Sequence, residues 1–404
     1  MPGKKRARRF FGAGKAILCV HSTPVSQMCI PDVRKIAILR ANALGDFVVT
    51  LPAIAALRAA YPAAEITLLG RPWHAAFLVP GRTPVDRVAV VPVMPGIREE
   101  AGKAEDARES EEFFSRMAAE RFDLALGFHG RGVAANPFLA RLGARVTAGL
   151  ASDGAAPLDR ELPFDYYQSE VVRYLDVVAL VGAPPVTLDP AVAVLPADRL
   201  EANAFLTGRP GFRPDRPYVV LHPCAVDVRR MWPAPQFAAA GDALAVRGYQ
   251  VLITGSEADR PVVDSIAGAM QRAVFPAAGG LSLGGLAALP AGSALTIASD
   301  TGPLHLARAV GARTVGIHWA PNLINWGPVT RARHRAAVSW RMPCPQCGVV
   351  PNDPYPFQPQ TEACRHLVSF VQDVGVAEVL GLADGLLKTA HPAGRETTFS
   401  GQLQ

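Results

Sequence analysis

The chain has 404 residues, of which half are hydrophobic and 19% are charged, and its formal net charge is +6. This composition can fill packed cores, and it excludes a chain that is disordered throughout. The length predicts two domains, and no apolar run approaches the ~18 residues that a membrane-spanning helix needs.

The excess positive charge lies near the N-terminus, where six basic residues precede the first acidic residue, Asp32. From there on, basic and acidic residues are balanced. Because a nucleic-acid-binding protein usually carries its excess charge on a folded face, we expect no nucleic-acid partner. Lys15 and His21 interrupt the apolar stretch that an export signal needs. Six cysteines in a chain of this length indicate no disulfide framework, which favours a cytoplasmic protein.

Short apolar runs alternate with helical patterns in the first half of the chain. We expect strands at Lys35–Leu39, Glu65–Leu69, Val88–Val93, Asp123–Phe128 and Arg145–Ala148. We expect helices at Phe47–Ala60 and over about 112–120, 133–142 and 167–182. This alternation predicts a parallel sheet with helices on both faces. The charged segment 99–112 indicates a solvated helix or an insertion.

Two proline-rich stretches, 183–196 and 208–217, precede a second alternation of the same kind. Its expected strands are Tyr218–Leu221, Val251–Thr254, Ala294–Ala298 and Thr314–His318, and its expected helices are Pro235–Val246, Ala258–Gln271 and Leu304–Val310. Residues 341–364 indicate a long loop. We therefore predict a basic, disordered extension at 1–33, domains at 34–195 and 196–385, and a tail at 386–404. Ligands of such sheets bind at the carboxyl ends of the strands, so we expect the site in the cleft between the domains.

The first candidate site follows the first predicted strand, where Gly45 permits a tight turn and Asp46 falls at the start of a helix. One interpretation is a helix N-cap, since an aspartate there accepts backbone N–H bonds and suits the positive end of the helix. The other is a carboxylate that faces the cleft and acts as a general base. The two interpretations are compatible, although an N-cap bond weakens a base.

The second candidate site is the segment 299–305, in which a strand ends, a glycine turn follows and a helix begins with Pro303. Backbone N–H groups at such a helix start can bind a diphosphate, with the Thr301 hydroxyl as a further donor. His305 lies about one turn into this helix, and we favour ligand contact over a structural role.

Two weaker candidates follow other strands of the second half. Arg229 and Arg230 can clamp phosphates in a bidentate manner, or they belong to an ordinary surface turn. Glu257 can accept hydrogen bonds from ribose hydroxyls, or it simply begins a helix.

A group of sulfur and imidazole side chains near the C-terminus offers zinc ligands, namely Cys344, Cys347, Cys364 and His366. Their spacing is not that of a standard four-ligand motif, so we favour free thiols or a disulfide and assign no metal site. The sequence also lacks a glycine-rich dinucleotide fingerprint and a P-loop, and it lacks the Asp-x-Asp pair of many sugar transferases.

Together these segments resemble glycosyltransferase family 9, the ADP-heptose:lipopolysaccharide heptosyltransferases, over about residues 34–380. The segments that carry the resemblance are Arg40 with Leu44-Gly45-Asp46 and Pro52, His222-Pro223 with Trp232-Pro233, Asp300 to His305, and Trp326-Gly327-Pro328. The sequence departs from the family's pattern at Cys224, where glycine is common, and at Arg230, where lysine is common.

The resemblance implies an α/β protein of the GT-B fold, with two Rossmann-like domains and a cleft between them. It implies an inverting, metal-independent transfer, without a cofactor, of a heptose or related sugar from an ADP-sugar such as ADP-heptose. Asp46 matches the general base. The implied donor site comprises Arg230, Glu257, Leu281, Asp300, Thr301, Gly302 and His305. From their place after strands of the first domain, we expect acceptor contacts at Arg71, Trp73, His74, His129 and Arg131.

The acceptor implied by the family is the lipopolysaccharide core on lipid A, at the cytoplasmic face of the inner membrane, which makes this a peripheral protein. Basic residues of the N-terminal extension would contribute about 1 kcal/mol each to such an association. Two alternatives stay open. The departures at Cys224 and Arg230 suit a nucleotide-sugar-binding protein that has lost catalysis, and a GT-B-like sugar-nucleotide epimerase is the other.

Overall fold

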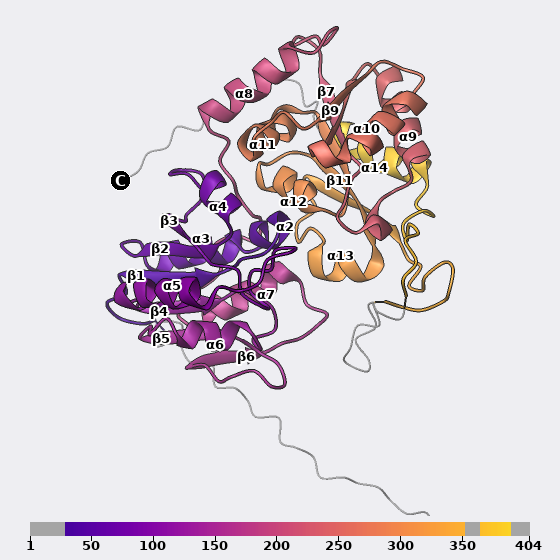
Figure 1. The fold of residues 1–404 in the computed structure, drawn as a ribbon. Helices are drawn as coiled ribbons and strands as arrows, with labels where there is room; N and C mark the ends of the chain where they lie inside the picture. Colours follow the sequence, from indigo (N-terminus) through magenta and orange to yellow (C-terminus); the bar gives the residue numbers. More distant parts are fainter. Residues whose placement is uncertain (1–28, 352–363, 389–404) are drawn as a thin grey trace, which may run out of the picture.

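The computed structural model describes residues 29–351 and 364–388, which form two six-stranded sheets flanked by helices (Figure 1). Every neighbouring pair of strands in both sheets is parallel. The predicted α/β architecture of two Rossmann-like domains is therefore confirmed. The predicted extension at 1–33 falls almost wholly outside the described residues, as does most of the predicted tail.

The first sheet has the strand order β3-β2-β1-β4-β5-β6. Its strands are β1 (Lys35–Leu39), β2 (Glu65–Gly70), β3 (Arg87–Val90), β4 (Leu124–Gly127), β5 (Val146–Ala151) and β6 (Arg160–Pro163). Its helices are α2 (Leu44–Val48), α3 (Leu51–Ala60), α4 (Pro72–Phe77), α5 (Ala107–Ala119), α6 (Ala135–Ala140) and α7 (Glu170–Ala179).

Strand β1 shows why this sheet is covered on both faces. Its side chains alternate, so that Ile36 and Ile38 pack into one core with α3 and α7, whereas Ala37 and Leu39 pack into another with α5 and α6. All four are fully buried. A short run of apolar residues without polar alternation is the pattern expected of a central parallel strand.

The second sheet repeats this topology, with the order β12-β11-β10-β7-β8-β9. Its strands are β7 (Tyr218–His222), β8 (Gln250–Gly255), β9 (Val274–Ala278), β10 (Leu295–Ser299), β11 (Thr314–Trp319) and β12 (His334–Ser339). Its α-helices are α8 (Pro196–Thr207), α9 (Ala234–Val246), α10 (Arg260–Ala269), α11 (Leu283–Gly292), α12 (Gly302–Ala309), α13 (Ala320–Trp326) and α14 (Val376–Lys388). Helices α9, α10 and α14 pack on one face, and α8 and α11 pack on the other.

Several elements differ from the sequence-based expectation. Strands β6, β9 and β12 were not predicted, and all three lie at sheet edges, where a strand needs no continuous apolar run. The single helix predicted at 47–60 is two helices, α2 and α3. The two helices separate before Pro52, because proline has no N–H to bond with the carbonyl of Val48. At this break the Thr50 hydroxyl donates to the Phe47 carbonyl at 2.7 Å.

The charged segment 99–112 divides into an exposed loop and the start of α5. Asp106 caps this helix by accepting the N–H groups of Arg108 and Glu109, while Phe113, Phe114 and Met117 bury its apolar face. The prediction of a solvated helix therefore holds only for the first turn of α5, because the helix buries an apolar face beyond that turn.

The linker between the two sheets is bonded to both domains. The Val192 N–H donates to the carbonyl of Ala309 in α12 at 2.9 Å, and the Ala193 N–H donates to that of Arg82 in the first domain at 2.9 Å. One turn later, Asp198 of α8 accepts two hydrogen bonds from the Arg82 guanidinium, at 2.7 and 2.9 Å. These contacts hold the two sheets in one arrangement across the cleft.

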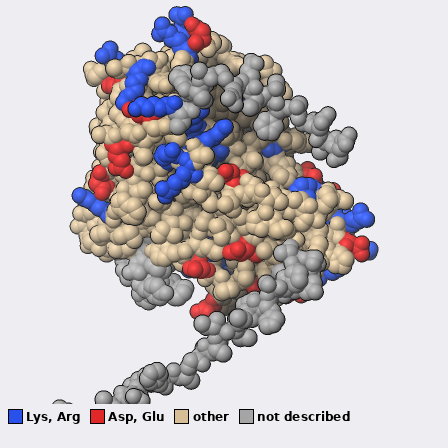
Figure 2. Space-filling model, turned by 180° about the vertical axis from the view of Figure 1, so that it is seen from behind, with Lys and Arg blue, Asp and Glu red and all other residues tan. Residues whose placement is uncertain are grey.

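No helix in the described part of the chain is long and apolar enough to cross a membrane. On the face shown in Figure 2, uncharged residues cover most of the surface, basic side chains gather toward the middle and upper part, and acidic ones lie at several other places. The residues after the N-terminal extension have balanced charge overall, but on this face basic side chains are locally concentrated.

Candidate active site

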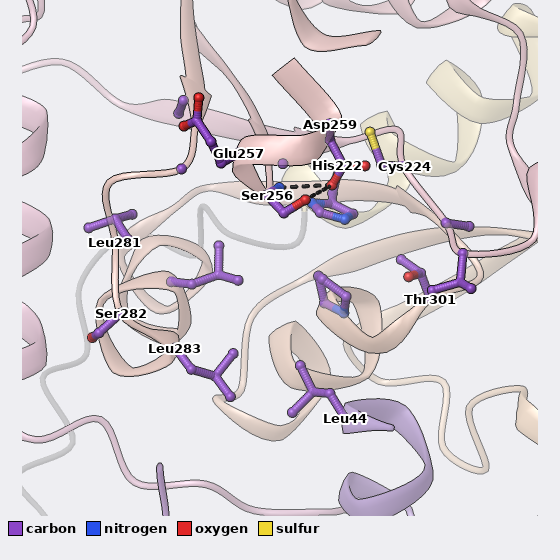
Figure 3. A pocket seen from close by; sticks show the side chains of 17 residues that line it. Leu44, His222, Cys224, Ser256, Glu257, Asp259, Leu281, Ser282, Leu283 and Thr301 are labelled. Atoms are coloured by element: carbon purple, nitrogen blue, oxygen red, sulfur yellow. Dashed lines mark hydrogen bonds between the residues drawn. The ribbon is translucent and has the colours of Figure 1, made fainter. Parts of the chain in front are cut away.

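The larger cavity lies at the carboxyl ends of β7 and β8, facing the first domain, and has a volume of about 570 Å³ (Figure 3). Three of the predicted donor residues line it, namely Glu257, Leu281 and Thr301. Leu44 of α2 closes it from the first domain. This is the place at which ligands bind in open parallel sheets, and the volume lies within the range of small-molecule pockets.

Helix α12 begins at this cavity, with Thr301 as its N-cap residue and Pro303 in its first turn. No side chain caps the helix. Pro303 has no N–H, and the N–H groups of Leu304 and His305 donate to the Thr301 carbonyl at 3.0 and 3.3 Å. The helix start therefore offers an anion the Gly302 N–H and the positive end of its dipole. The predicted anion-binding helix start is thus positioned where a diphosphate can reach it.

Asp300, directly before this N-cap, does not reach the cavity. Its carboxylate is buried, with Oδ1 lying 3.6 Å from His305 Nε2 and 3.5 Å from His318 Nδ1. Burial alone would raise the pKa of Asp300, but the two histidines outweigh it and hold the pKa well below its usual range. Burial lowers the pKa of His305, against the opposing influence of Asp300. Asp300 therefore serves to position the start of α12 and His305.

The departure at Cys224 lies inside the same cavity. Burial, and to a smaller extent the neighbouring Asp259, raises the pKa of the Cys224 thiol to about 12, so the thiol stays neutral. Asp259 in turn accepts hydrogen bonds from the Ser256 N–H and hydroxyl at 2.8 and 2.7 Å. His222 contacts the Thr254 hydroxyl at 3.0 Å, and burial lowers its pKa to about 4. The floor of the cavity is therefore uncharged apart from Asp259.

Glu257 stands at the rim, with its side chain 71% exposed and both carboxylate oxygens bonded to Arg260. Arg260 lowers the pKa of Glu257, so the carboxylate is ionised and keeps further lone pairs for ligand hydroxyls. Glu257 begins the 3₁₀ helix η2 (Glu257–Asp259), so the interpretation as a helix-start residue is confirmed, and its contact with ribose stays a prediction.

The two arginines after β7 have different roles. Arg229 is bonded to Asp227 through two of its nitrogens, the shortest of these contacts being 2.7 Å. Arg230 lines a neighbouring cavity of about 190 Å³ with Asn322 and Trp326, and its buried Nε has no hydrogen-bond partner among the described residues. Arg229 lines this cavity too but is paired with Asp227, so Arg230 is the less engaged of the two arginines, and a phosphate clamp stays a prediction.

The second site is a cavity of about 330 Å³ on the first domain that brings together Asp46, Arg71 and His129. Asp46 is the third residue of α2, and the N-cap is Ala43, so the predicted N-cap position is wrong. Its carboxylate accepts the Ala43 N–H at 3.2 Å from inside the helix. The side chain is 25% exposed, which leaves part of the carboxylate open to the cavity.

Arg40 fixes the orientation of Asp46. Its Nε donates to the Asp46 carbonyl at 2.8 Å and its Nη2 donates to Oδ1 at 3.1 Å. The same buried guanidinium donates to the Phe128 carbonyl and, at 2.8 Å, to the Tyr174 hydroxyl. An arginine bonded through all three of its nitrogens in this way holds a carboxylate in one rotamer.

The remaining acceptor candidates separate into two groups. His129 accepts the Ala41 N–H on Nδ1 at 3.3 Å and lies 3.1 Å from the Gly96 carbonyl on Nε2, and burial with the nearby Arg40 lowers its pKa to about 4. Arg71 donates to the Glu99 carbonyl at the rim of the same cavity.

The other three candidates do not line that cavity. Trp73 and His74 stack on each other with ring centroids 3.6 Å apart and pack against Phe47. Arg131 lies over the rings of Phe164 and Tyr166. The structure therefore gives these side chains packing contacts within the first domain.

The two cavities are separated by α2, and the domains touch there through glycines. A Cβ on Gly45 would lie 2.9 Å from His305 Cδ2, and a Cβ on Gly302 would lie 3.0 Å from Leu44 Cβ. Only residues without a side chain permit this approach. Gly302, predicted as a donor residue, thus also forms the contact between α2 and α12.

Two similar α/β domains with a nucleotide-sized cavity on one and a carboxylate-bearing cavity on the other define the GT-B class of proteins. A model of glycosyltransferase family 9 (heptosyltransferase) matches residues 111–349, more than half of the chain. The chain belongs to this family, and the resemblance inferred from the sequence is confirmed.

Lipopolysaccharide heptosyltransferase 3 of Escherichia coli is 34% identical over 114 residues, which is 28% of this chain. The matched segment spans only 34% of that curated relative. A glycosyl transferase family 9 structure from Veillonella parvula DSM 2008 has a TM-score of 0.69 at 20% identity, covering 88% of this chain and 97% of that one. The E. coli ADP-heptose lps heptosyltransferase II structure has a TM-score of 0.66 at 18% identity, covering 88% and 99%. Both structures share the fold.

Sequence reasoning missed two kinds of residue. The first is the support for Asp46, because Arg40 reaches Tyr174 across 134 positions of sequence. The second is the convergence of four side chains that were named as possible zinc ligands but favoured as free thiols or a disulfide: Cys344, Cys347, Cys364 and His366 have ligand atoms within 4.8 Å of one another. The residue types signalled this cluster, but their spacing did not.

Proposed function

We propose that this protein is an inverting glycosyltransferase that moves a heptose, or a related sugar, from an ADP-sugar to a lipopolysaccharide core acceptor. The observation that carries the proposal is the position of α2 between the two cavities. Leu44 lines the larger cavity and Asp46, two residues later, lines the smaller one. A donor and an acceptor bound on the two sides meet at this helix.

In the proposed reaction the acceptor hydroxyl lies beside Asp46, which takes its proton as the hydroxyl oxygen bonds to the anomeric carbon. The bond from that carbon to the diphosphate breaks, and ADP leaves with the electron pair. Arg230 and the start of α12 stabilise the negative charge where it develops. No metal takes part at the reacting atoms. The adenosine occupies the 570 Å³ cavity, with its ribose hydroxyls toward Glu257 and its base beside Leu281.

The proposed acceptor is anionic, which suits the smaller cavity. Arg71 contributes a cation there, while neutral His129, whose ring nitrogens are bonded to the Ala41 N–H and the Gly96 carbonyl, forms part of the wall. A lipid-linked acceptor also brings the enzyme to a membrane surface as a peripheral protein, facing the cytoplasm. Membership of a family of heptosyltransferases, and relatives named for lipopolysaccharide and ADP-heptose, support this choice of substrates.

The deciding experiment incubates the full chain with ADP-heptose and a delipidated core acceptor, and follows ADP release and product mass. We expect Asp46→Asn to lower turnover by 10²–10⁴-fold, the usual contribution of a general base, with ADP affinity unchanged. Asp215→Asn, an exposed carboxylate paired with Arg213 away from both cavities, is the matched control and should keep full turnover.

Near-full transfer by Asp46→Asn would show that the carboxylate only stabilises α2. Binding of ADP-sugars without turnover, across a donor panel, would favour a protein that has lost catalysis. Isomerisation of the donor without any acceptor would favour an epimerase.

A further inference from the structure

A cluster of sulfur and imidazole ligands lies outside both cavities, in the chain between β12 and α14. His366 Nδ1 is 3.7 Å from the sulfur atoms of both Cys344 and Cys364, and the sulfurs of Cys347 and Cys364 are 3.6 Å apart. All four ligand atoms lie within 4.8 Å of one another. Two of the cysteines, Cys344 and Cys364, are buried in the core of the second domain.

The separations between these four ligand atoms are those expected of ligands around one metal ion. A tetrahedral zinc ion with Zn–S of about 2.3 Å and Zn–N of about 2.0 Å separates its ligands by roughly 3.8 Å between sulfurs and 3.5 Å between sulfur and nitrogen. A disulfide instead requires sulfurs about 2.05 Å apart. The contacts of 3.6 and 3.7 Å agree with the first geometry and not with the second.

The backbone of the first two ligands is folded to present both sulfurs on one side. The Gly348 N–H donates to the Cys344 carbonyl at 3.0 Å, and Gly348 has a φ of 76°, which favours glycine. The Cys344 N–H in turn donates to the Val349 carbonyl at 2.7 Å, which closes the turn that carries the two cysteines.

The cluster also has a structural task, because the chain around it has little regular structure. The described residues 341–351 and 364–375 contain no helix or strand. They nevertheless hold the turn that carries Arg230, since the Phe370 N–H donates to the Arg229 carbonyl at 2.8 Å and the Ser369 hydroxyl donates to that of Met231 at 2.7 Å.

We propose that Cys344, Cys347, Cys364 and His366 bind one structural zinc ion, which fastens the segment between β12 and α14 to the Arg229–Arg230 turn. Four protein ligands close the coordination sphere, so the ion takes no part in transfer chemistry. Three thiolates and Zn²⁺ leave one negative charge at the site. The zinc site stands whether or not the proposed transferase activity does; only its effect on donor binding rests on that activity.

The test measures zinc and iron by mass spectrometry in the full chain, purified without chelator. We expect about one zinc per chain, and less than a tenth of that in Cys347→Ser and His366→Ala, which remove the two exposed ligands. Cys29→Ser, an exposed cysteine outside the cluster, should keep about one zinc. Zinc below about a tenth of an equivalent in the unaltered chain, with none bound on titration with Zn²⁺ under reducing conditions, overturns the proposal.

Two further measurements separate zinc from a reduced or oxidised thiol cluster. Titration of the apo-protein with Co²⁺ should give the strong visible bands of a tetrahedral thiolate site in the unaltered chain and in Cys29→Ser, and not in the two ligand variants. Intact-mass analysis should find no disulfide; a Cys347–Cys364 disulfide in the freshly purified chain would contradict the site. In the transferase assay, loss of zinc should raise KM for the ADP-sugar more than it lowers kcat, because Arg230 loses its support.

Discussion

The buried ion pair between Arg82 and Asp198 is the contact whose removal should most clearly reveal how the domains are joined. The side chains are only 5% and 7% exposed, and Arg82 donates two hydrogen bonds across the linker. In Arg82→Met the methionine fills the space, but the Asp198 carboxylate stays buried with only the Leu195 N–H as a donor, at 2.8 Å. Removing one partner of a buried ion pair in this way lowers the free energy of unfolding by about 3–5 kcal/mol, because the other charge stays buried without it.

We expect the lower part of that range, about 3 kcal/mol, because the Leu195 N–H still compensates part of the charge. Equilibrium unfolding in guanidinium chloride, followed by tryptophan fluorescence, measures the change. Arg82→Met with Asp198→Leu should recover most of the loss, leaving about 1 kcal/mol for the lost helix cap. Arg108→Met, which breaks the exposed pair with Glu112 on α5, is the control and should cost about 0.5 kcal/mol or less.

The pH dependence gives a second check on the same pair. Burial alone would raise the pKa of Asp198, but Arg82 and the Leu195 N–H outweigh it, so the pKa is lowered. A lowered pKa in the folded state means that the stabilisation is present above the unfolded value of about 3.9 and is lost as the pH falls through the folded value. The gap between the unaltered chain and Arg82→Met should therefore close only in acid. A cost below about 1 kcal/mol at pH 7, or a double variant less stable than Arg82→Met, would refute the reasoning.

Two further predictions concern the cleft. Gly45→Ala inserts a methyl 2.9 Å from His305 Cδ2 and should separate α2 from α12, lowering kcat on the order of 100-fold, whereas Gly268→Ala, which meets no atom within 4 Å, should leave kcat unchanged. Equal rates for the two variants would mean that the contact does not position Asp46. Arg230→Met removes the one free guanidinium of its turn and should raise KM for the ADP-sugar roughly 10–150-fold, while Arg247→Met, on the far side of α9, should not. An unchanged KM would remove Arg230 from the donor site.

Much of the architecture was predictable because it depends on local patterns. The central residues of three runs, 36–39, 219–221 and 315–317, include no charged or polar side chain. This pattern indicates strands buried on both faces, and all three runs lie in strands of the sheets. The glycine turns before α2 and α12 are equally local. Edge strands such as β6 were not predictable in this way, because their alternating exposure carries no continuous apolar signal.

The candidate site also contains residues that local sequence could predict and residues that it could not. Asp46 and Thr301 could be inferred because each follows a strand at the end where ligands bind, whatever the rest of the chain does. That Asp300 is buried against His305 and His318 could not be inferred, because helix geometry alone does not decide which neighbour of a turn points inward.

By itself, the sequence determined that the chain forms two parallel α/β domains, and it indicated which turns are candidates for its chemistry, since both follow from residue spacing along short segments. Only the tertiary structure decided that α2 separates two cavities, that Arg229 is engaged and Arg230 free, and that four scattered side chains meet as one ligand set. These facts depend on contacts between residues far apart in the chain. Such contacts are fixed by packing across the cleft and over the second sheet, where no local pattern records them.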